Sequence, residues 1–331
     1  MNYIGAKTKL LPFLHQCIEK EVGDSLKSTV FCDLFAGTGT VAKSFKTKVK
    51  KVIANDLEYY SYTLLRHYVG NNQILSADTY FEKLNALEGE LGFISNHYGE
   101  GGAANRSYFS QENARKIDAI RQQIEAWKPA IDDQLFYFLL ASFIESVDKV
   151  ANTASVYGAF LNHIKTTARK TLFIEPAETV VAECTTEVYQ EDANVLVQNI
   201  SGDILYLDPP YNARQYGANY HILNTLAEYK KFEPKGITGL PHYNKSLYCS
   251  KRTVEDALVQ LLEAAQFKHI FLSYNNEGLI SAKRLENLLS EYGAVKRYTT
   301  NYQRFKADKD SNRAHKATST QEFLFYLCKR S

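Results

Sequence analysis

The amino-acid sequence predicts an α/β protein with a mainly parallel, doubly wound sheet and an inserted helical subdomain. Three observations support this fold class. Short apolar, β-branched runs recur along the chain, helical patterns lie between most of them, and one long central stretch has helical patterns without strand signals. A chain of 331 residues can hold one large α/β domain with an insertion, or two domains.

Seven runs have the composition of buried strands: residues 30–35, 52–55, 187–190, 204–207, 269–274, 295–300 and 322–327. Helical patterns separate most of them, as expected for βαβ crossovers between parallel strands, at residues 40–45, 59–69, 254–265 and 282–292. A basic loop rather than a helix joins the last two runs. We therefore expect about seven mostly parallel strands, with an antiparallel hairpin at one edge.

The strand pattern disappears between residues 72 and 183, where helical patterns dominate. Two long helices are predicted there, over residues 110–128, where Ser110 can cap the first turn, and over residues 131–150. We expect residues 1–71 and 184–331 to form one domain, and residues 72–183 to form an inserted helical subdomain.

Composition excludes several classes of protein. No apolar stretch approaches the roughly 20 residues that span a bilayer, and the first residues do not resemble a secretory signal, so a cytoplasmic protein without a membrane partner is expected. The five cysteines are scattered without metal-ligand spacing, which argues against a disulfide framework and against a metal site. The net charge of +2 is nearly neutral, but basic and aromatic residues are interleaved between Lys296 and Lys316. Such a segment is either a solvated loop or a phosphate-binding stripe.

A glycine-containing turn follows the first predicted strand directly. The segment Asp33-Leu34-Phe35-Ala36-Gly37-Thr38-Gly39-Thr40 leads from that strand into a helix. The two glycines allow a tight turn and a close approach of the backbone to a ligand, and the first N–H groups of the helix can bind an anionic group such as an amino-acid carboxylate. A glycine turn also has a purely structural use here, so this motif alone is weak evidence for a ligand.

Asp56 ends the second predicted strand. In nucleotide-binding α/β folds an acidic side chain at this position accepts hydrogen bonds from ribose hydroxyls. The dinucleotide fingerprint is incomplete, because Lys43 or Ser44 stands near the place of its third glycine. The pattern favours a smaller, adenosine-containing ligand.

Asp208-Pro209-Pro210-Tyr211 follows the apolar run at residues 204–207. The prolines stiffen the loop and remove backbone donors, so it offers carbonyl and carboxylate acceptors beside an aromatic face. This combination suits a planar, amine-bearing ligand such as a nucleobase, although a proline-stiffened surface turn with a capping Asp is the alternative. If the strand order reverses between the first and fourth strands, this loop faces the glycine turn across the switch point.

Together these motifs resemble the S-adenosylmethionine-dependent N6-adenine DNA methyltransferases of the alpha class, the Dam-like group. The N-terminal Tyr3-Ile4-Gly5-Ala6-Lys7 adds to the resemblance, and longer stretches at residues 148–153, 212–216, 219–221 and 273–276 resemble the subgroup that accompanies restriction enzymes. The resemblance implies a Rossmann-like methyltransferase sheet and a target-recognition role for the helical insert. It also implies S-adenosylmethionine as cofactor, double-stranded DNA as partner, and a cognate restriction endonuclease acting separately.

The resemblance also implies roles for individual residues. The implied cofactor-binding residues are Tyr3, Lys7, Asp33, Phe35, Gly37, Gly39, Asp56, Asp192, Ala193 and Asp208. Asp56 would bind the ribose, and Asp192 with Ala193 would meet the adenine ring of the cofactor. Asp192 could instead be a strand-end cap, and Lys7 an ordinary surface lysine.

Asp208, Pro209, Pro210 and Tyr211 are the implied catalytic residues. The lone pair of adenine N6 is delocalised into the ring, so hydrogen bonds from N6 to the Asp208 carboxylate and the Pro209 carbonyl would localise it for attack on the methyl group. An adenine inside a duplex must first be flipped out, and Tyr211 is the expected stacking partner, with a core aromatic as the alternative.

Phosphate contacts are expected from basic residues in two loops and after the catalytic tetrapeptide: Arg214, Lys245, Lys251, Arg252, Arg304, Lys306, Arg313 and Lys316. Arg106, Asn162 and Arg169 of the insert are candidates for reading base edges. Three alternatives remain open: N4-cytosine methylation, adenine methylation in RNA, and a catalytically inactive DNA-binding or specificity relative.

Overall fold

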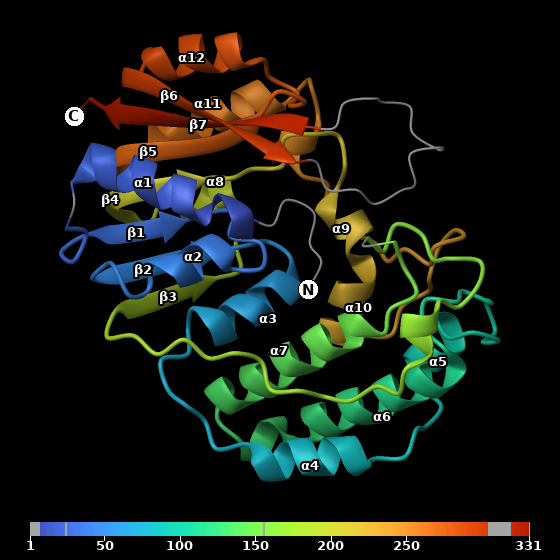
Figure 1. Cartoon of the computed structure of the whole chain (residues 1–331). Coiled ribbons are helices and arrows are strands. Elements are labelled where there is room, and N and C mark those ends of the chain that lie inside the picture. The colour runs from blue at the N-terminus through green and yellow to red at the C-terminus, as the bar shows by residue number, and fades with distance from the viewer. Residues whose placement is uncertain (1–6, 24, 155, 304–318, 331) are drawn as a thin grey trace. The chain divides into compact units, whose positions relative to one another are not determined.

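The seven predicted strands form one sheet in the order β3-β2-β1-β4-β5-β7-β6. The computed structural model describes residues 7–23, 25–154, 156–303 and 319–330 (Figure 1). The strands are β1 (Val30–Asp33), β2 (Lys51–Asn55), β3 (Thr185–Tyr189), β4 (Ser201–Leu207), β5 (Gln266–Asn275), β6 (Gly293–Gln303) and β7 (Ser319–Lys329). All neighbouring pairs are parallel except those made by β7, which runs antiparallel to both β5 and β6. The predicted fold class and edge hairpin are confirmed.

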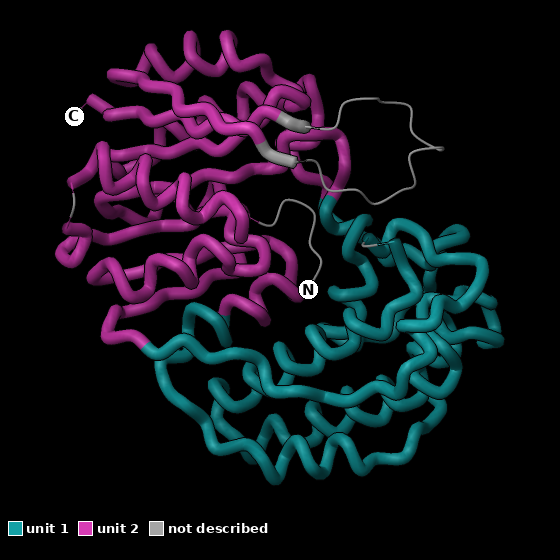
Figure 2. The backbone as a smooth tube through the Cα atoms, viewed as in Figure 1, with its two compact units in different colours: residues 1–4, 66–181, 216–244 teal, residues 5–65, 182–215, 245–331 magenta. Residues whose placement is uncertain are grey.

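The chain forms two compact units (Figure 2). Among the described residues, one unit, the sheet unit, contains those of residues 7–65, 182–215 and 245–330, and the other, the helical unit, contains those of residues 66–181 and 216–244. The expected insert at residues 72–183 accounts for most of the helical unit. Residues 216–244, which we expected in the catalytic domain, cluster with the helical unit instead.

Helices cover both faces of the sheet (Figure 1). The helices and 3-10 turns encoded near the strands are η1 (Thr8–Leu10), α1 (Leu11–Val22), α2 (Thr40–Phe45), α3 (Tyr59–Tyr68), α8 (Ala193–Leu196), η4 (Leu247–Cys249), α11 (Val254–Ala264) and α12 (Ala282–Ser290). On the face covered by α2, Phe31 of β1 stacks on Phe45 with ring centroids 4.0 Å apart. Because side chains alternate along a strand, Cys32 and Leu34 point to the other face.

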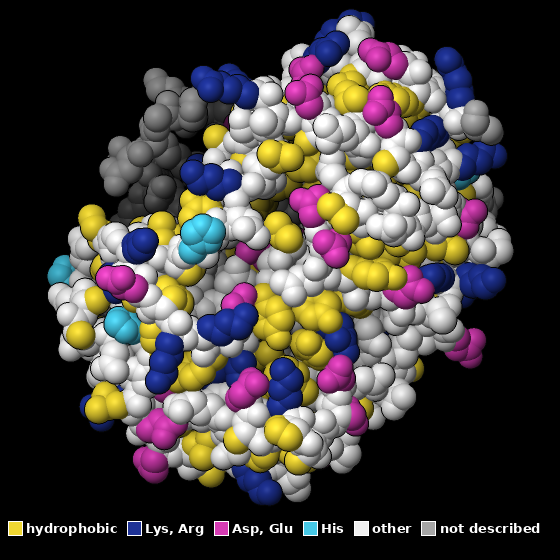
Figure 3. Space-filling model, turned by 180° about the vertical axis from the view of Figure 1, so that it is seen from behind, with side chains coloured by type: hydrophobic (Ala, Val, Ile, Leu, Met, Phe, Trp, Pro, Cys, Tyr) yellow, Lys and Arg dark blue, Asp and Glu magenta, His cyan; other side chains and the backbone are white. Residues whose placement is uncertain are grey.

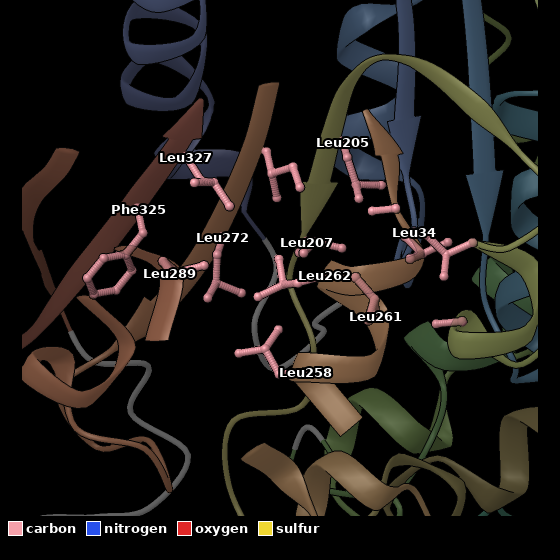
Figure 4. Close-up of a cluster of buried hydrophobic side chains, with 14 of the residues drawn as sticks. Leu34, Leu205, Leu207, Leu258, Leu261, Leu262, Leu272, Leu289, Phe325 and Leu327 are labelled. Atoms are coloured by element: carbon pink, nitrogen blue, oxygen red, sulfur yellow. The ribbon is translucent and has the colours of Figure 1, made fainter. Parts of the chain in front are cut away.

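That other face carries a hydrophobic cluster that joins the sheet to α8, α11 and α12. Figure 4 shows part of it, with leucines of β4, β5 and α11 among its members. Leu205, Leu261 and Phe325 in this cluster are fully buried. At roughly 1.5–3 kcal/mol for each buried large side chain, this packing fixes the strand ends that carry the polar motifs.

The helical unit contains α4 (Asp78–Ala86), α5 (Phe93–His97), α6 (Gln111–Trp127), η2 (Lys128–Ala130), α7 (Asp133–Lys149), η3 (Thr166–Arg169), α9 (Tyr216–Asn219) and α10 (His221–Glu228). The first long helix begins after Ser110, as the sequence predicts, and the second begins at Asp133, two residues after its predicted start. Ser110 accepts a hydrogen bond from the Asn113 N–H, and Asp132 accepts one from the Leu135 N–H, so each helix starts at a side-chain cap.

Candidate active site

The sheet reverses its strand order between β1 and β4, as predicted. Asp33 of β1 is in register with Tyr206 of β4, and the Leu34 N–H donates to the Tyr206 carbonyl over 3.2 Å. The glycine turn after β1 and the Asp208 loop after β4 therefore leave the same edge of the sheet side by side. Ligands of open α/β sheets bind at this position.

The glycine turn is tied to the end of β2 through Asp56. Gly37 and Gly39 have φ angles of 55° and 79°, in the left-handed region that glycine adopts without strain. The Gly37 N–H donates to Asp56 Oδ2 over 2.8 Å, and the Glu58 N–H donates to Asp56 Oδ1 over 3.0 Å. Burial raises the pKa of Asp56 to about 6, although these donors lower it in part.

Asp33 is a buried carboxyl group with incomplete hydrogen bonding. Its Oδ2 accepts from the Ala42 N–H of α2 over 3.1 Å, while Oδ1 has no hydrogen-bond partner among the described residues. Burial raises its pKa well above the usual value, and the nearby charge of Asp208 raises it further. We expected the N–H groups around this turn to be free for a ligand, but those of Gly37 and Ala42 are engaged by carboxylates.

Lys7 is the main partner of Asp208. Its side chain is only 6% exposed, and Nζ lies 3.1 Å from Asp208 Oδ1, so the alternative of an ordinary surface lysine is wrong. Burial raises the pKa of Asp208, whereas Lys7 and a hydrogen bond with Ser273 lower it in part. The pKa of Lys7 lies well above its usual value because burial, which lowers it, is outweighed by nearby acidic groups, with Asp208 first.

The rest of the tetrapeptide packs against the sheet. Pro209 is buried, whereas Pro210 and Tyr211 are partly buried. The Tyr211 ring meets Tyr274 edge-on at 5.9 Å, and its carbonyl accepts from the Leu279 N–H over 2.8 Å. Tyr211 therefore has a packed ring edge and a fixed backbone, and Lys7 Nζ lies 5.9 Å from its ring centroid.

Asp192 and Phe35 contact Asn194 and Tyr248, respectively, two residues that the sequence motifs do not mark. Asp192 is the N-cap of α8, where it accepts from the Asn194 N–H over 2.8 Å, rather than the strand-end cap given as its structural alternative, and Ala193 is buried. Phe35 meets Tyr248 edge-on at 5.1 Å, and the Tyr248 hydroxyl donates to Asn194 Oδ1 over 2.7 Å. No local sequence signal marks Tyr248, since only the fold brings it to Phe35.

Four of the expected phosphate-binding residues are described, and all four are exposed: Arg214, Lys245, Lys251 and Arg252. Tyr3 and the other four, Arg304, Lys306, Arg313 and Lys316, lie outside the described residues. Two further cations of the basic segment are engaged on β6, because Lys296 pairs with Glu21 and Arg297 with Glu286. On the face shown in Figure 3, basic side chains are interspersed with acidic ones rather than gathered in one stripe.

Arg106 has a structural position within the helical unit. Its guanidinium donates to the carbonyls of Ile237 and Gly236, each over 3.1 Å, and makes longer contacts with those of His97 and Pro234. Backbone acceptors therefore occupy its guanidinium. This differs from our expectation that Arg106 would be free to read a base edge. Arg169 lies 3.8 Å from Glu100.

The described part of the chain was searched for metal-binding groups and for membrane-spanning helices. There, no group of three or more acidic, His or Cys side chains is arranged to hold a metal ion. The helices of the same residues include none with the length and apolarity needed to cross a membrane.

The fold and the site define a class: an α/β methyltransferase whose glycine turn and Asp208 loop meet at the switch point of the sheet. The chain belongs to the D12 class of N6 adenine-specific DNA methyltransferases, because residues 3–288 match that family. It is 55% identical to Type II methyltransferase M.NlaIII of Neisseria lactamica over 99% of both chains. It is also 38% identical to M.FokI of Planomicrobium okeanokoites, over 99% of this chain and 53% of that one, and 36% identical to M.CviAII of Paramecium bursaria Chlorella virus 1, over 99% and 98%. The protein is thus an adenine-specific DNA methyltransferase of the restriction-modification type, as the sequence motifs suggested.

Proposed function

We propose that this enzyme takes its methyl group from S-adenosylmethionine and transfers it to N6 of an adenine flipped out of duplex DNA. The observation that carries the proposal is the excess of carboxyl groups at the carboxyl edge of the sheet. Asp33, Asp56 and Asp208 are charge neighbours there, and Lys7 is the basic residue that acts on Asp33 and Asp208.

The site fits a ligand with cationic groups. The Asp33 carboxyl is buried, its Oδ1 has no hydrogen-bond partner among the described residues, and like charges raise its pKa. A cation or a hydrogen-bond donor placed there would stabilise the ionised form. S-adenosylmethionine carries a sulfonium and an ammonium group against one carboxylate, so its charge matches this demand.

The same residues suggest how the cofactor would be held. Asp33, Gly37 and Gly39 would bind its amino-acid part, Asp56 its ribose, and Phe35 with Asp192 and Ala193 its adenine. Lys7 is proposed to act on the cofactor side through Asp208, given the 3.1 Å separation of the two charges. When bound, the cofactor supplies an activated methyl group.

Asp208 is the proposed acceptor for the substrate amine. Its ionised carboxylate and the Pro209 carbonyl would accept hydrogen bonds from the two N6–H groups. These hydrogen bonds would draw the nitrogen lone pair out of conjugation and toward the methyl group. Direct displacement would form the new N–C bond while the bond between the methyl carbon and the cofactor sulfur breaks, so the cofactor would leave as a neutral thioether. The proton lost from N6 would pass toward Asp208. Positioning of this kind can supply about 7–11 kcal/mol of the barrier reduction.

Tyr211 is the proposed stacking surface for the flipped base, which would contribute roughly 1–3 kcal/mol. Phosphate contacts are proposed for Arg214, Lys245, Lys251 and Arg252, whose side chains are exposed. We assign recognition of the DNA site to the helical unit. We also propose that the enzyme acts in the cytoplasm beside a separate restriction endonuclease.

The test uses duplex DNA, labelled S-adenosylmethionine and digestion of the product to nucleosides. Label is expected only in N6-methyladenine; label in N4-methylcytosine, or a preference for RNA, would contradict the proposal. Asp208→Asn should abolish transfer, and its effect on cofactor binding should be much smaller than its effect on transfer. Asp203→Asn is the matched control, because Asp203 lies on the same strand, where it accepts from the Val30 N–H over 2.7 Å. Cofactor binding without turnover in the unmodified protein would identify an inactive relative.

A further inference from the structure

Glu322 is a buried carboxylate that the proposed chemistry does not use. It lies on β7, where it is paired in register with Asn275 of β5, and its side chain is 9% exposed. Its Oε1 accepts from Asn275 Nδ2 over 3.4 Å, and Oε2 has no hydrogen-bond partner among the described residues. The residues that follow it on the strand, from Phe323 to Leu327, are buried and apolar, so Glu322 lies at the start of the buried part of β7.

Glu322 and Asp208 share one cation. Lys7 Nζ lies 3.1 Å from Asp208 Oδ1 and 3.9 Å from Glu322 Oε2, and its side chain is 6% exposed. When both carboxyl groups are ionised, the two carboxylates and one ammonium carry one net negative charge. Burying a charge is costly unless the charge is paired and hydrogen-bonded, because desolvation disfavours the ionised form.

A third buried carboxyl group belongs to the electrostatic surroundings of the cluster, because Asp33 is influenced by both Asp208 and Lys7. Lys7 is influenced by Asp208, Tyr206, Glu322 and Tyr211. Glu322 is influenced by Lys7, Asp208 and Glu277, and burial raises its pKa.

We propose that Glu322 is a positioning residue for methyl transfer, which acts by dividing the charge of Lys7 between itself and Asp208. A lysine held by Asp208 alone would neutralise that carboxylate and occupy its acceptor oxygen. With Glu322 drawing on the same ammonium, Asp208 keeps more negative charge and accepts more strongly from the substrate amine. The inference rests on the proposed acceptor role of Asp208.

The first variant is Glu322→Gln, which keeps the size of the side chain and removes its charge. Without the second carboxylate, Lys7 acts more strongly on Asp208 and lowers its pKa. The acid limb of the kcat–pH profile should move to lower pH, and kcat on the plateau should fall by about tenfold, an effect on the transition state. KM for DNA and the Kd for S-adenosylmethionine should stay within about twofold, since a charge-dividing role does not touch either ligand.

Two further variants complete the design. Glu322→Asp keeps the charge and should return the acid limb toward its original position even if packing suffers. Glu187→Gln is the matched control, because it breaks the 2.6 Å Lys51–Glu187 pair in the same sheet, and it should leave kcat and the acid limb unchanged.

The possible outcomes separate the two proposals. If Asp208→Asn still transfers methyl groups, the acceptor role fails and this inference fails with it. If Asp208→Asn is inactive but Glu322→Gln has an unmoved acid limb, only this inference is overturned. A lower melting temperature with unchanged kcat and acid limb would likewise overturn it, since that pattern shows a purely structural carboxylate.

Discussion

Buried charges are treated differently in the helical unit and at the carboxyl edge of the sheet. In the helical unit, Asp118 accepts from the N–H groups of Ile94 and Ser95 and from the Tyr229 hydroxyl. Arg121, 2% exposed, donates to two backbone carbonyls of α10 and pairs with Glu125. At the sheet edge, Asp33 has an oxygen without a hydrogen-bond partner among the described residues.

The two regions differ in how completely the protein satisfies the hydrogen bonds of their buried charges. A buried charge whose hydrogen bonds are satisfied by the protein holds segments together, as Asp118 does for α5, α6 and the end of α10. A buried charge with unused capacity leaves an interaction for a ligand to complete. Mutations in the two regions should therefore have opposite consequences for folding and for binding.

Asp118→Ala should have the largest effect, and it should be on stability. The substitution leaves two backbone N–H groups and the Tyr229 hydroxyl without their acceptor in a buried site, which should lower the free energy of unfolding by about 3–5 kcal/mol. Urea denaturation measures this loss. The Kd for S-adenosylmethionine in the folded fraction should not change. Normal stability with weakened cofactor binding would contradict the distinction between the regions.

Asp33→Asn should show the reverse pattern. The amide oxygen can still accept from the Ala42 N–H, but the charge available to a cationic ligand is lost. The Kd for S-adenosylmethionine should rise by roughly 10–100-fold, as for the loss of a hydrogen bond to a charged group. The free energy of unfolding should not fall, since burial and Asp208 already disfavour ionised Asp33. Calorimetric titration and urea denaturation check the two parts, with Asp203→Asn as control.

The sequence predicted the sheet well because the strands are apolar runs whose pattern follows from burial. It also located the switch-point loops and the start of α6 at Ser110, since these depend on neighbouring residues. It could not predict the partners of Asp208. Lys7 and Glu322 are 315 residues apart (322 − 7), and their side chains meet only in the folded protein, where the pairing of β7 with β5 places Glu322 beside Asn275.

The sequence shows the charges of Arg106 and of the basic segment that begins at Lys296, but not their contacts. The contacts of Arg106, Lys296 and Arg297 come from tertiary neighbours. Residues 216–244 follow the catalytic tetrapeptide in sequence, yet cluster with the helical unit. A sequence pattern shows which groups are charged, but not which acceptors the fold brings to them.

Ionisation of Asp56 should make the affinity for the cofactor moderately dependent on pH. The pKa of Asp56 is raised to about 6, and an ionised carboxylate is the better acceptor for ribose hydroxyls. Affinity should therefore increase as pH rises through about 6, by at most about tenfold per unit for one proton, with proton release on binding. Calorimetry at pH 6 in buffers of different ionisation enthalpy measures that release; proton uptake would contradict it.

The same raised pKa should make the stability of the cofactor-free protein change in the opposite direction with pH. In the cofactor-free protein, the Asp56 carboxyl favours its protonated form more than an unfolded chain does. Its contribution to stability is therefore present at low pH and is lost as pH rises through about 6. Urea denaturation between pH 5 and pH 7 checks this sign, and Asp56→Asn should flatten the dependence.

Replacement of Arg106 should give the smallest effect and the sharpest test of the helical unit. Arg106 holds a turn in which Lys235 and Leu240 exchange backbone hydrogen bonds, and whose glycines 236 and 239 have φ angles of 67° and 73°. Arg106→Ala removes donors to carbonyls at a partly exposed site, so a loss of about 1 kcal/mol in local stability is expected. Hydrogen exchange should speed up at residues 235–240.

DNA recognition distinguishes a bracing role for Arg106 from base reading. An arginine that contacts a base edge contributes about 1–3 kcal/mol of discrimination at one position, so its removal would relax specificity there. An arginine that braces a turn affects all sites alike. We expect Arg106→Ala to lower methylation of cognate and single-mismatch duplexes by the same factor, because its guanidinium is already committed to the carbonyls of Gly236 and Ile237. Arg106→Lys is the matched variant, since it keeps the charge but loses the forked geometry that reaches both carbonyls. A selective gain at one mismatched position would instead return Arg106 to the base-reading role that its sequence first suggested.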